Sequence, residues 1–266
     1  MLSEDRDLKK YNSSLPFTGE RIIPGKVSKY HFYEAFCRYE FVKHYVKDKI
    51  VLDAGCGQGY GAFFLSNNAK SVVGIDIAHE AINDAKKNYI QPNLCFKIMD
   101  ITKMEFPNNF FDVICSFEAI EHLDDHGLFL TEVARVLKPS GHFFISTPNG
   151  EVFGRGELWC HKKEFILEEV RSILNSYFDE IELFGQHALN KAMLLYRNSL
   201  IRRINKIKAR FGVVHLLPIR WKYILERLFT GHSSEHATCS DFIISKKNVR
   251  QGVYFFTICQ KPKLYL

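Results

Sequence analysis

The chain of 266 residues has no uninterrupted apolar run long enough to cross a membrane, for which about 18 residues are needed. Its first residues, MLSEDRDLKKYNSS, also lack the apolar stretch of a secretory signal. These two absences lead us to expect a cytoplasmic protein. Since 46% of the residues are hydrophobic, the chain can bury a large core of its own.

Closely spaced cysteine pairs are also missing. The seven cysteines are an odd number, and no C-x-x-C pair occurs among them. The sequence therefore indicates neither a disulfide framework nor a structural zinc site, and we expect reduced thiols. There is no internal repeat and no low-complexity tract.

Acidic residues are scarce in one segment. Between Lys191 and Arg227 there are ten Lys or Arg and a single acid, so this segment carries +9 in a chain whose net charge is +6. We expect a basic helical insert at about 186–250, with a helix that has Leu200, Ile204, Ile207 and Phe211 on one face and Arg202, Arg203, Lys206 and Arg210 on the other. Such a helix suits a solvated face, a membrane surface or an anionic acceptor.

Between residues 49 and 185 the sequence alternates short β-branched runs with helical periods. The expected strands are residues 49–54, 71–76, 94–99, 111–116 and 142–147, followed by 179–185 and 252–260. One of the intervening helices is expected to begin at about Lys163. This alternation is typical of βαβ units and a parallel sheet, so the fold class is α/β. We place an N-terminal helical lead at residues 1–48 and the main domain at 49–266.

The stretch VLDAGCGQGYGA, residues 51–62, places Gly55, Gly57 and Gly59 directly after an apolar strand and before a helix. In a parallel sheet this edge binds ligands. The dinucleotide fingerprint G-x-G-x-x-G would need a third glycine at position 60, which is Tyr60. This departure disfavours a nicotinamide cofactor.

Three acids follow successive strands and describe the ligand further. Asp76 lies 19 residues after Gly57, where a carboxylate can accept hydrogen bonds from both ribose hydroxyls. Asp100 closes the third strand and is expected to meet the amino edge of an adenine, with Ile77 and Ile101 over its ring faces. Asp53 adds negative charge that favours a sulfonium or amino group over a pyrophosphate. These features point to S-adenosylmethionine.

The ordered motifs VLDAGCGQGYGA, VVGIDI, KIMDI, FDVICSFEAIEHL and LKPSGHFFISTPN resemble those of the class I S-adenosylmethionine-dependent methyltransferases. The resemblance covers about residues 45–185 and the final strand. It implies a Rossmann-like seven-stranded sheet, mostly parallel with the last strand antiparallel and with helices on both faces. It also implies that the glycine loop holds the methionine moiety, Asp76 the ribose, and Asp100 with Ile101 the adenine. A non-catalytic adenosyl-binding protein is the alternative from another class.

The stretch after the fourth expected strand lies where the methyl group is presented. A hydroxyl acceptor must lose its proton during transfer, and His122 is our candidate for the general base. Ser116 and Glu118, on the same stretch, are expected to contact the cofactor.

The same stretch reads E-x-x-E-H, which resembles a divalent-metal pattern of small-RNA 2′-O-methyltransferases and ubiquinone-pathway O-methyltransferases. By that resemblance Glu118, Glu121, His122 and His161 would hold the ion. The run also occurs widely in relatives without a metal, so we favour the metal-free interpretation.

The N-terminal run Thr18–Pro24, the pair Arg38-Tyr39 and the triplet Ser240–Phe242 resemble parts of bacterial methyltransferases of surface-glycan and O-antigen biosynthesis. There the leader covers the cofactor as a lid, which implies that Arg21, Tyr30 and Tyr39 touch the methionine carboxylate or the acceptor. The alternative is that the aromatic residues of this leader, such as Tyr30 and Tyr39, only pack the helix against the sheet.

For the acceptor we expect an oxygen of a glycan or lipid-linked saccharide, with the basic insert at the anionic inner surface of the membrane. RNA and a small phenolic or quinone-like compound are the alternative acceptors.

Overall fold

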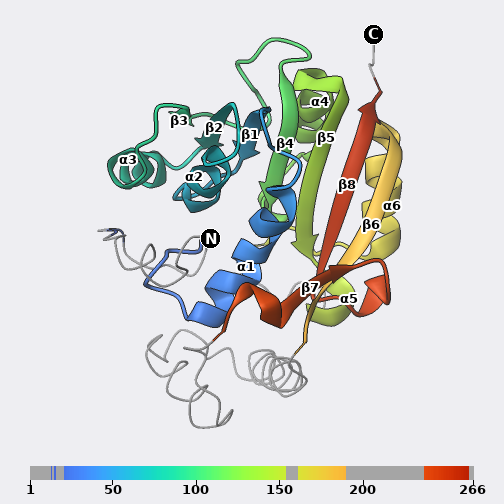
Figure 1. Ribbon diagram of the computed structural model, residues 1–266. Coiled ribbons are helices and arrows are strands. Elements are labelled where there is room, and N and C mark those ends of the chain that lie inside the picture. The colour runs from blue at the N-terminus through green and yellow to red at the C-terminus, as the bar shows by residue number, and fades with distance from the viewer. Residues whose placement is uncertain (1–12, 14, 16–20, 154–160, 190–236, 264–266) are drawn as a thin grey trace.

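The computed structural model describes residues 13, 15, 21–153, 161–189 and 237–263. An eight-stranded sheet runs through this part of the chain in the order β3-β2-β1-β4-β5-β8-β6-β7 (Figure 1). Its strands are β1 (Ile50–Ala54), β2 (Ser71–Asp76), β3 (Leu94–Ile98), β4 (Phe111–Phe117), β5 (Leu137–Pro148), β6 (Phe178–Ala188), β7 (Phe242–Ser245) and β8 (Tyr254–Pro262). The α-helices are α1 (Lys29–Val42), α2 (Tyr60–Ser66), α3 (His79–Asn88), α4 (His126–Val136), α5 (Gly150–Phe153) and α6 (Leu167–Tyr177). Short 3₁₀ turns are η2 (Ile120–His122), η5 (Cys239–Asp241) and η6 (Val249–Gln251).

The pairing of the strands confirms the Rossmann-like α/β prediction. Strands β3, β2, β1, β4 and β5 are paired in parallel. The final strand β8 runs antiparallel to both neighbours, β5 and β6, so two runs far apart in sequence lie side by side. Every parallel strand therefore directs its carboxyl end to the same edge of the sheet.

The predicted number of strands was wrong, because the sheet has eight strands and not seven. The additional strand is β7, which pairs antiparallel with the end of β6 from Gly185 to Ala188. Strand β7 and residues 186–188 of β6 fall inside the predicted insert of 186–250, so the ends of that insert belong to the sheet. Four residues at a sheet edge carry too little hydrophobic pattern to predict a strand.

Two predicted boundaries also shift. Strand β5 begins at Leu137 and not at 142, with an irregularity in its pairing opposite Phe111 and Val113. Helix α6 begins at Leu167 and not at about Lys163, because Phe165 pairs with Asn149 in a β-bridge. The carboxylate of Glu169 then accepts the N–H of Ile166 at 3.0 Å and stabilises the helix start.

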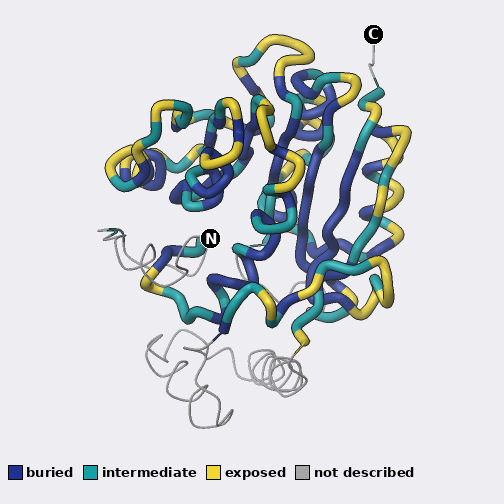
Figure 2. Tube along the Cα trace, viewed as in Figure 1, coloured by how far each residue is buried: buried dark blue, intermediate teal, exposed yellow. Residues whose placement is uncertain are grey.

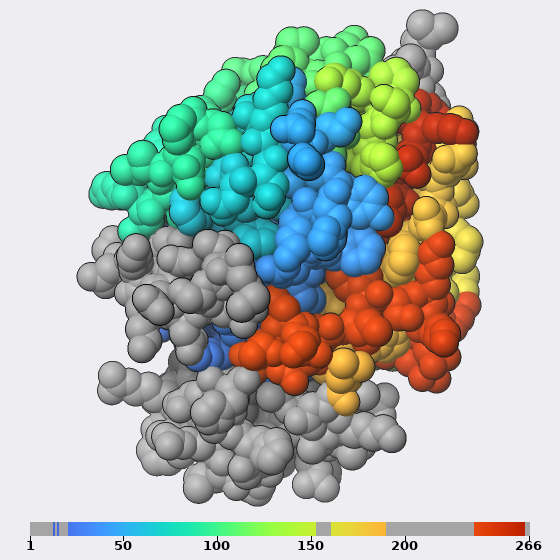
Figure 3. Space-filling model, in the orientation of Figure 1, coloured from blue at the N-terminus to red at the C-terminus, as the bar shows by residue number. Residues whose placement is uncertain are grey.

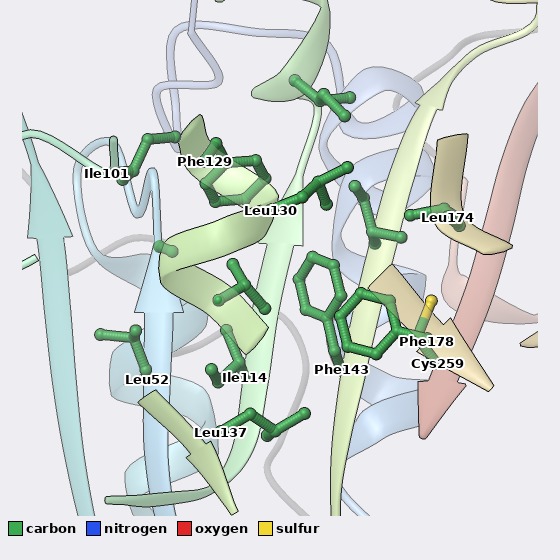
Figure 4. Packing of buried hydrophobic residues seen from close by; sticks show 14 of the residues in the cluster. Leu52, Ile101, Ile114, Phe129, Leu130, Leu137, Phe143, Leu174, Phe178 and Cys259 are labelled. Carbon is green, nitrogen blue, oxygen red and sulfur yellow. The ribbon is translucent and has the colours of Figure 1, made fainter. Parts of the chain in front are cut away.

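Helices cover both faces of the sheet, as predicted. Successive strand residues point to opposite faces, so Leu52, Ile114 and Phe143 pack with α4 and α6, whereas Val51 and Phe144 pack with α1, α2 and α3. In the first cluster the rings of Phe143 and Phe178 stack with centroids 5.6 Å apart (Figure 4). The central strands are the most deeply buried part of the chain (Figure 2).

Helix α1, from the predicted N-terminal lead, packs on the sheet face through Tyr39 and Val42. Its other end contacts η5 and β7, and the surface of α1 borders that of the C-terminal segment in Figure 3. The rings of Tyr30 and Phe242 lie 5.0 Å apart at this contact. The two predicted amphipathic patterns of the basic insert fall within residues 190–236, which lie outside the described part of the chain.

None of the helices in the described residues is long and apolar enough to span a membrane. Six cysteines in the same residues form no disulfide: Cys37, Cys56, Cys95, Cys115, Cys239 and Cys259.

Candidate functional site

The glycine loop between β1 and α2 lies at the carboxyl edge of the sheet. The backbone N–H groups of Gly55 and Cys56 both donate to the carbonyl of Ile75 at 2.9 Å, which ties the loop to the end of β2. Gly55, Gly57 and Gly59 have φ values of +79°, +52° and +81°. Glycine suits these positions because other residues rarely adopt left-handed conformations.

Two glycines of the loop differ in what they make room for. A Cβ on Gly59 would lie 2.4 Å from the ring of Phe96, so this glycine permits close packing within the protein. A Cβ on Gly57 would meet nothing within 4 Å. The loop therefore has an open side at Gly57, the side on which a ligand can approach the backbone.

Asp76 is bound directly to this loop. One of its carboxylate oxygens accepts the N–H of Gly57 at 2.8 Å, and the other accepts the N–H of Ala78 at 2.9 Å. The side chain is thereby oriented at the end of β2, beside Ile77, which is 67% exposed. An oriented carboxylate next to an exposed apolar side chain suits a ribose joined to a planar base.

Asp100 and Ile101 follow β3 and point in different directions. Asp100 is exposed, and its carboxylate accepts both the N–H and the hydroxyl of Thr102 at 2.8 and 2.7 Å. Ile101 is only 8% exposed and packs into the first hydrophobic cluster (Figure 4). Of the two isoleucines that we expected beside the adenine, Ile77 is open to a ligand and Ile101 is largely covered.

Asp53 lies below the loop and is completely buried. The hydroxyl of Tyr39 is 3.3 Å from both of its carboxylate oxygens and donates to them. Burial raises the pKa of Asp53 to about 7, although the Tyr39 hydrogen bond lowers it. A positive group bound nearby would favour the ionised form of this carboxyl group.

The end of β4 carries Ser116 and Glu118. The Ser116 hydroxyl is buried and has no hydrogen-bond partner among the described residues. Glu118 has a φ of +53°, donates its N–H to the carbonyl of Ser146 at 3.1 Å, and forms an ion pair with Arg38 of α1. Arg38 is only 1% exposed.

Sequence reasoning did not identify Arg38 as a site residue of its own. It appeared only as part of a short leader motif, whereas the structure brings it from α1 to the end of β4. One signal could have found it: Glu34 and Arg38 are four residues apart, so they share a face of a helix that is otherwise rich in aromatic residues.

His122, Glu121 and His161 come together beyond the end of β4. The N–H groups of Lys162 and Lys163 donate to the carbonyl of Glu121, which draws the neighbouring His161 towards η2. The rings of His122 and His161 are perpendicular, with centroids 4.9 Å apart. One ligand atom from each of the three residues lies within 4.8 Å of the others.

Burial favours the uncharged forms of Glu121 and His161. Burial and the nearby Glu118 together raise the pKa of Glu121 to about 8, although the Thr147 hydroxyl, which donates to it at 3.0 Å, lowers it. The pKa of His161 is lowered, first by burial and then by His122. A neutral imidazole can accept a proton or bind a metal ion.

This group would suit a divalent metal, because a carboxylate and two imidazoles are common ligands of first-row transition ions. The four-residue set that we considered is not assembled around one point. Glu121, His122 and His161 converge, whereas Glu118 is paired with Arg38.

The other leader residues have separate partners. Arg21 forms an ion pair with Glu80 at 2.9 Å, Tyr30 packs on Phe242, and Tyr39 donates to Asp53. Of these three, Tyr39 is thus the one hydrogen-bonded to a predicted cofactor residue.

A parallel sheet, a glycine loop open at its carboxyl edge and an oriented carboxylate on the next strand define the class of α/β proteins that bind a cofactor with a ribose at this edge. Comparison with known proteins agrees. Residues 52–145 match the methyltransferase domain family. A probable S-adenosylmethionine-dependent methyltransferase of Mycolicibacterium smegmatis is 34% identical over 175 residues, which cover 64% of this chain and 67% of that protein. The chain belongs to the S-adenosylmethionine-dependent methyltransferase family.

This chain is also similar to an O-methyltransferase in sequence and to a solved methyltransferase in structure. A ubiquinone biosynthesis O-methyltransferase of Bartonella tribocorum is 36% identical over 101 residues, covering 37% of this chain and 41% of that protein. The crystal structure of an S-adenosylmethionine-dependent methyltransferase from Thermotoga maritima matches with a TM-score of 0.57 at 15% identity, over 87% of this chain and 91% of that one. At this identity the structural match supports the fold alone.

The protein is thus a methyltransferase whose cofactor is S-adenosylmethionine. The cofactor supplies a methyl group on a positively charged sulfur, and the chain has to align the acceptor, exclude water and remove the acceptor's proton where there is one.

Proposed function

We propose that the protein transfers the methyl group to a hydroxyl oxygen of a glycan or a lipid-linked saccharide. The observation that carries the oxygen acceptor is the pairing of His122 with His161 beside Glu121. A hydroxyl needs a base during transfer. The ring of His161 lies edge to face with that of His122, with centroids 4.9 Å apart, and so orients the His122 imidazole at the end of β4. We assign the base to His122.

Two further observations support the acceptor class. One relative is a ubiquinone biosynthesis O-methyltransferase, which supports an oxygen acceptor. The leader motif and the +9 segment between Lys191 and Arg227 support an anionic saccharide carrier. RNA would explain the same charge, and a phenolic compound would explain the O-methyltransferase relative.

Transfer of a tritiated methyl group into a total cell extract tests the acceptor. The products are separated into lipid, polysaccharide, RNA and protein fractions, and we expect the label in the lipid or polysaccharide fraction. Label confined to RNA would contradict the proposal.

The base is tested by His122→Ala and by His122→Asn, which keeps a polar side chain of similar size. Both variants should lose about 10²- to 10⁴-fold in transfer rate. Their affinity for S-adenosylhomocysteine should stay close to that of the unmodified protein. An unchanged rate in both variants would remove His122 from this role.

A metal ion held by Glu121, His122 and His161 is the alternative means of lowering the acceptor's pKa. Chelation followed by elemental analysis separates the two mechanisms. A base mechanism predicts full activity after treatment with EDTA, and a metal mechanism predicts loss of activity that added Mn²⁺ or Zn²⁺ restores.

Association with an anionic membrane is part of the same proposal. Binding to vesicles of anionic lipid should weaken with salt and with Arg202, Arg203 and Lys206 changed to Glu. These residues lie outside the described part of the chain, so this proposal depends on their charge in the sequence. Tight binding to single-stranded RNA, without binding to vesicles, would point to the RNA alternative.

A further inference from the structure

The most deeply buried basic side chain in the described residues is that of Arg38, which is 1% exposed. Removing an ion from water is unfavourable unless partners compensate. The partners of Arg38 are the Glu118 carboxylate, the Gln186 side-chain oxygen at 2.7 Å and the ring of Tyr254 at 4.3 Å. Glu118 follows β4, Gln186 lies on β6 and Tyr254 begins β8, so one side chain joins three separate parts of the sheet to α1.

Helix α1 is held in place by a second set of contacts beside Arg38. The Gln186 side-chain amide donates to the backbone carbonyl of Glu34 at 2.6 Å, and the Tyr254 hydroxyl donates to the Glu34 carboxylate at 3.4 Å. Helix α1 crosses in front of the sheet towards β7 (Figure 1). Arg38 therefore approaches Glu118 from a fixed support.

Glu118 needs such a support. It is one of five non-glycine residues with positive φ in the described part of the chain, and it lies at the end of the strand next to the glycine loop. A left-handed conformation of a residue with a Cβ is strained and persists where the surroundings impose it. Here the surroundings are the hydrogen bond to Ser146 and the ion pair with Arg38.

The Glu118 side chain remains 31% exposed although its partner is buried. The Oε1 atom of Glu118 is buried against Arg38, while the side chain as a whole stays accessible. The Nη2 atom of Arg38 is also buried without a hydrogen-bond partner among the described residues. Glu118 and Arg38 can therefore each form a further polar contact at the edge between the glycine loop and β4.

We propose that Arg38 is a positioning residue that holds Glu118 at this edge, so that the pair forms the subsite for the amino-acid end of the cofactor. The Glu118 carboxylate binds the positively charged ammonium group of the cofactor. Arg38 fixes the direction of the Glu118 carboxylate and the left-handed backbone conformation of Glu118. This inference rests on the cofactor, and it is independent of the acceptor.

The test compares two ligands that share the adenosine and differ in the amino-acid end. S-adenosylhomocysteine carries the ammonium and carboxylate groups, whereas 5′-methylthioadenosine lacks both. Calorimetry measures the affinity of each ligand for Arg38→Met, Arg38→Lys and Glu118→Gln, and a thermal melt of each variant confirms that it folds. Arg135→Met is the matched control, since Arg135 is also paired with a glutamate, Glu132 at 2.8 Å, and lies away from the site.

We expect Arg38→Met and Glu118→Gln to weaken S-adenosylhomocysteine binding about 10- to 100-fold, which corresponds to a lost hydrogen bond to a charged group. Binding of 5′-methylthioadenosine should change less than about twofold, since the amino-acid end that the pair would contact is absent from it. Arg38→Lys should recover part of the loss, and the double variant Arg38→Met/Glu118→Gln should be no weaker than the single ones, because the two side chains act as a unit.

Equal weakening of both ligands would overturn the proposal, because it would show that Arg38 only stabilises the fold. Unchanged binding of both ligands would overturn it as well. If Arg38→Met does not fold, Arg38→Lys and Glu118→Gln decide the question by the same comparison. A failure of methyl transfer to saccharides would leave these affinities untouched, so the two proposals fail separately.

Discussion

Asp53 is the residue for which the structure makes the sharpest quantitative prediction. Its carboxyl group is completely buried, and its folded-state pKa is about 7 against 3.8 in the unfolded chain. Replacement by asparagine keeps the shape of the protonated form and removes the titration. The difference in stability between the two proteins should therefore depend on pH in a way that isolates this one group.

The sign follows from proton binding. Between about pH 4 and pH 7 the folded state retains a proton that the unfolded chain releases, so the free energy of unfolding falls as the pH rises. A shift of this size corresponds to about 4 kcal/mol at roughly 1.4 kcal/mol per pKa unit. Relative to the unmodified protein, Asp53→Asn should gain about that amount between pH 4 and pH 8. Below pH 4 the two proteins should be similarly stable.

The measurement is urea unfolding without cofactor at several pH values. The pH dependence of Glu121 and of the surface groups occurs in both proteins and cancels in the difference. Calorimetry adds a second readout, because a positively charged ligand near Asp53 favours its ionised form. S-adenosylmethionine binding should then release a proton at about pH 6 in the unmodified protein and fewer protons in Asp53→Asn.

If the difference in the free energy of unfolding between the unmodified protein and Asp53→Asn is constant from pH 4 to pH 8, the reasoning is refuted. A constant difference would mean that the buried carboxyl group is ionised throughout, stabilised by a partner other than Tyr39. Loss of folding in Asp53→Asn at pH 5 would also contradict it, since the replacement resembles the form expected there.

Further outcomes follow from the same site. Tyr39→Phe removes the hydrogen bond that lowers the pKa of Asp53, so the midpoint of its titration, followed by unfolding at several pH values, should move upward; a downward shift would contradict this. Asp76→Ala should weaken cofactor binding by about 1.5 to 3 kcal/mol in calorimetry, because ribose hydroxyls lose a charged acceptor, and unaltered affinity would disprove the assignment. Gly59→Ala should lower the free energy of unfolding by at least about 2 kcal/mol, since its Cβ would meet Phe96 in a left-handed conformation. Compared with Gly59→Ala, Gly57→Ala should lower the free energy of unfolding less and should weaken cofactor binding more, because its Cβ would point to the open side of the loop. Equal losses of stability in the two glycine variants would contradict an open side at Gly57.

Much of the fold could be predicted because its determinants are local. The positions of β1 to β4 follow from short β-branched runs, and the predicted ends differ from the observed ones by at most one residue. Strand β7 could not be found in this way, because it depends on pairing with the end of β6 and not on its own four residues. The start of α6 likewise depends on the bridge between Phe165 and Asn149.

Within the site, the order of the chain alone determined that a glycine loop and the acids Asp53 and Asp76 follow parallel strands, because the carboxyl ends of such strands meet at one edge. Only the tertiary structure decided which groups face each other there. It pairs Arg38 with Glu118 across 80 positions of sequence, converges His122 and His161, and buries Asp53 and Glu121 so that their pKa values rise to about 7 and about 8. Burial and the distance between charges are properties of the packed chain, and no local pattern of residues encodes them.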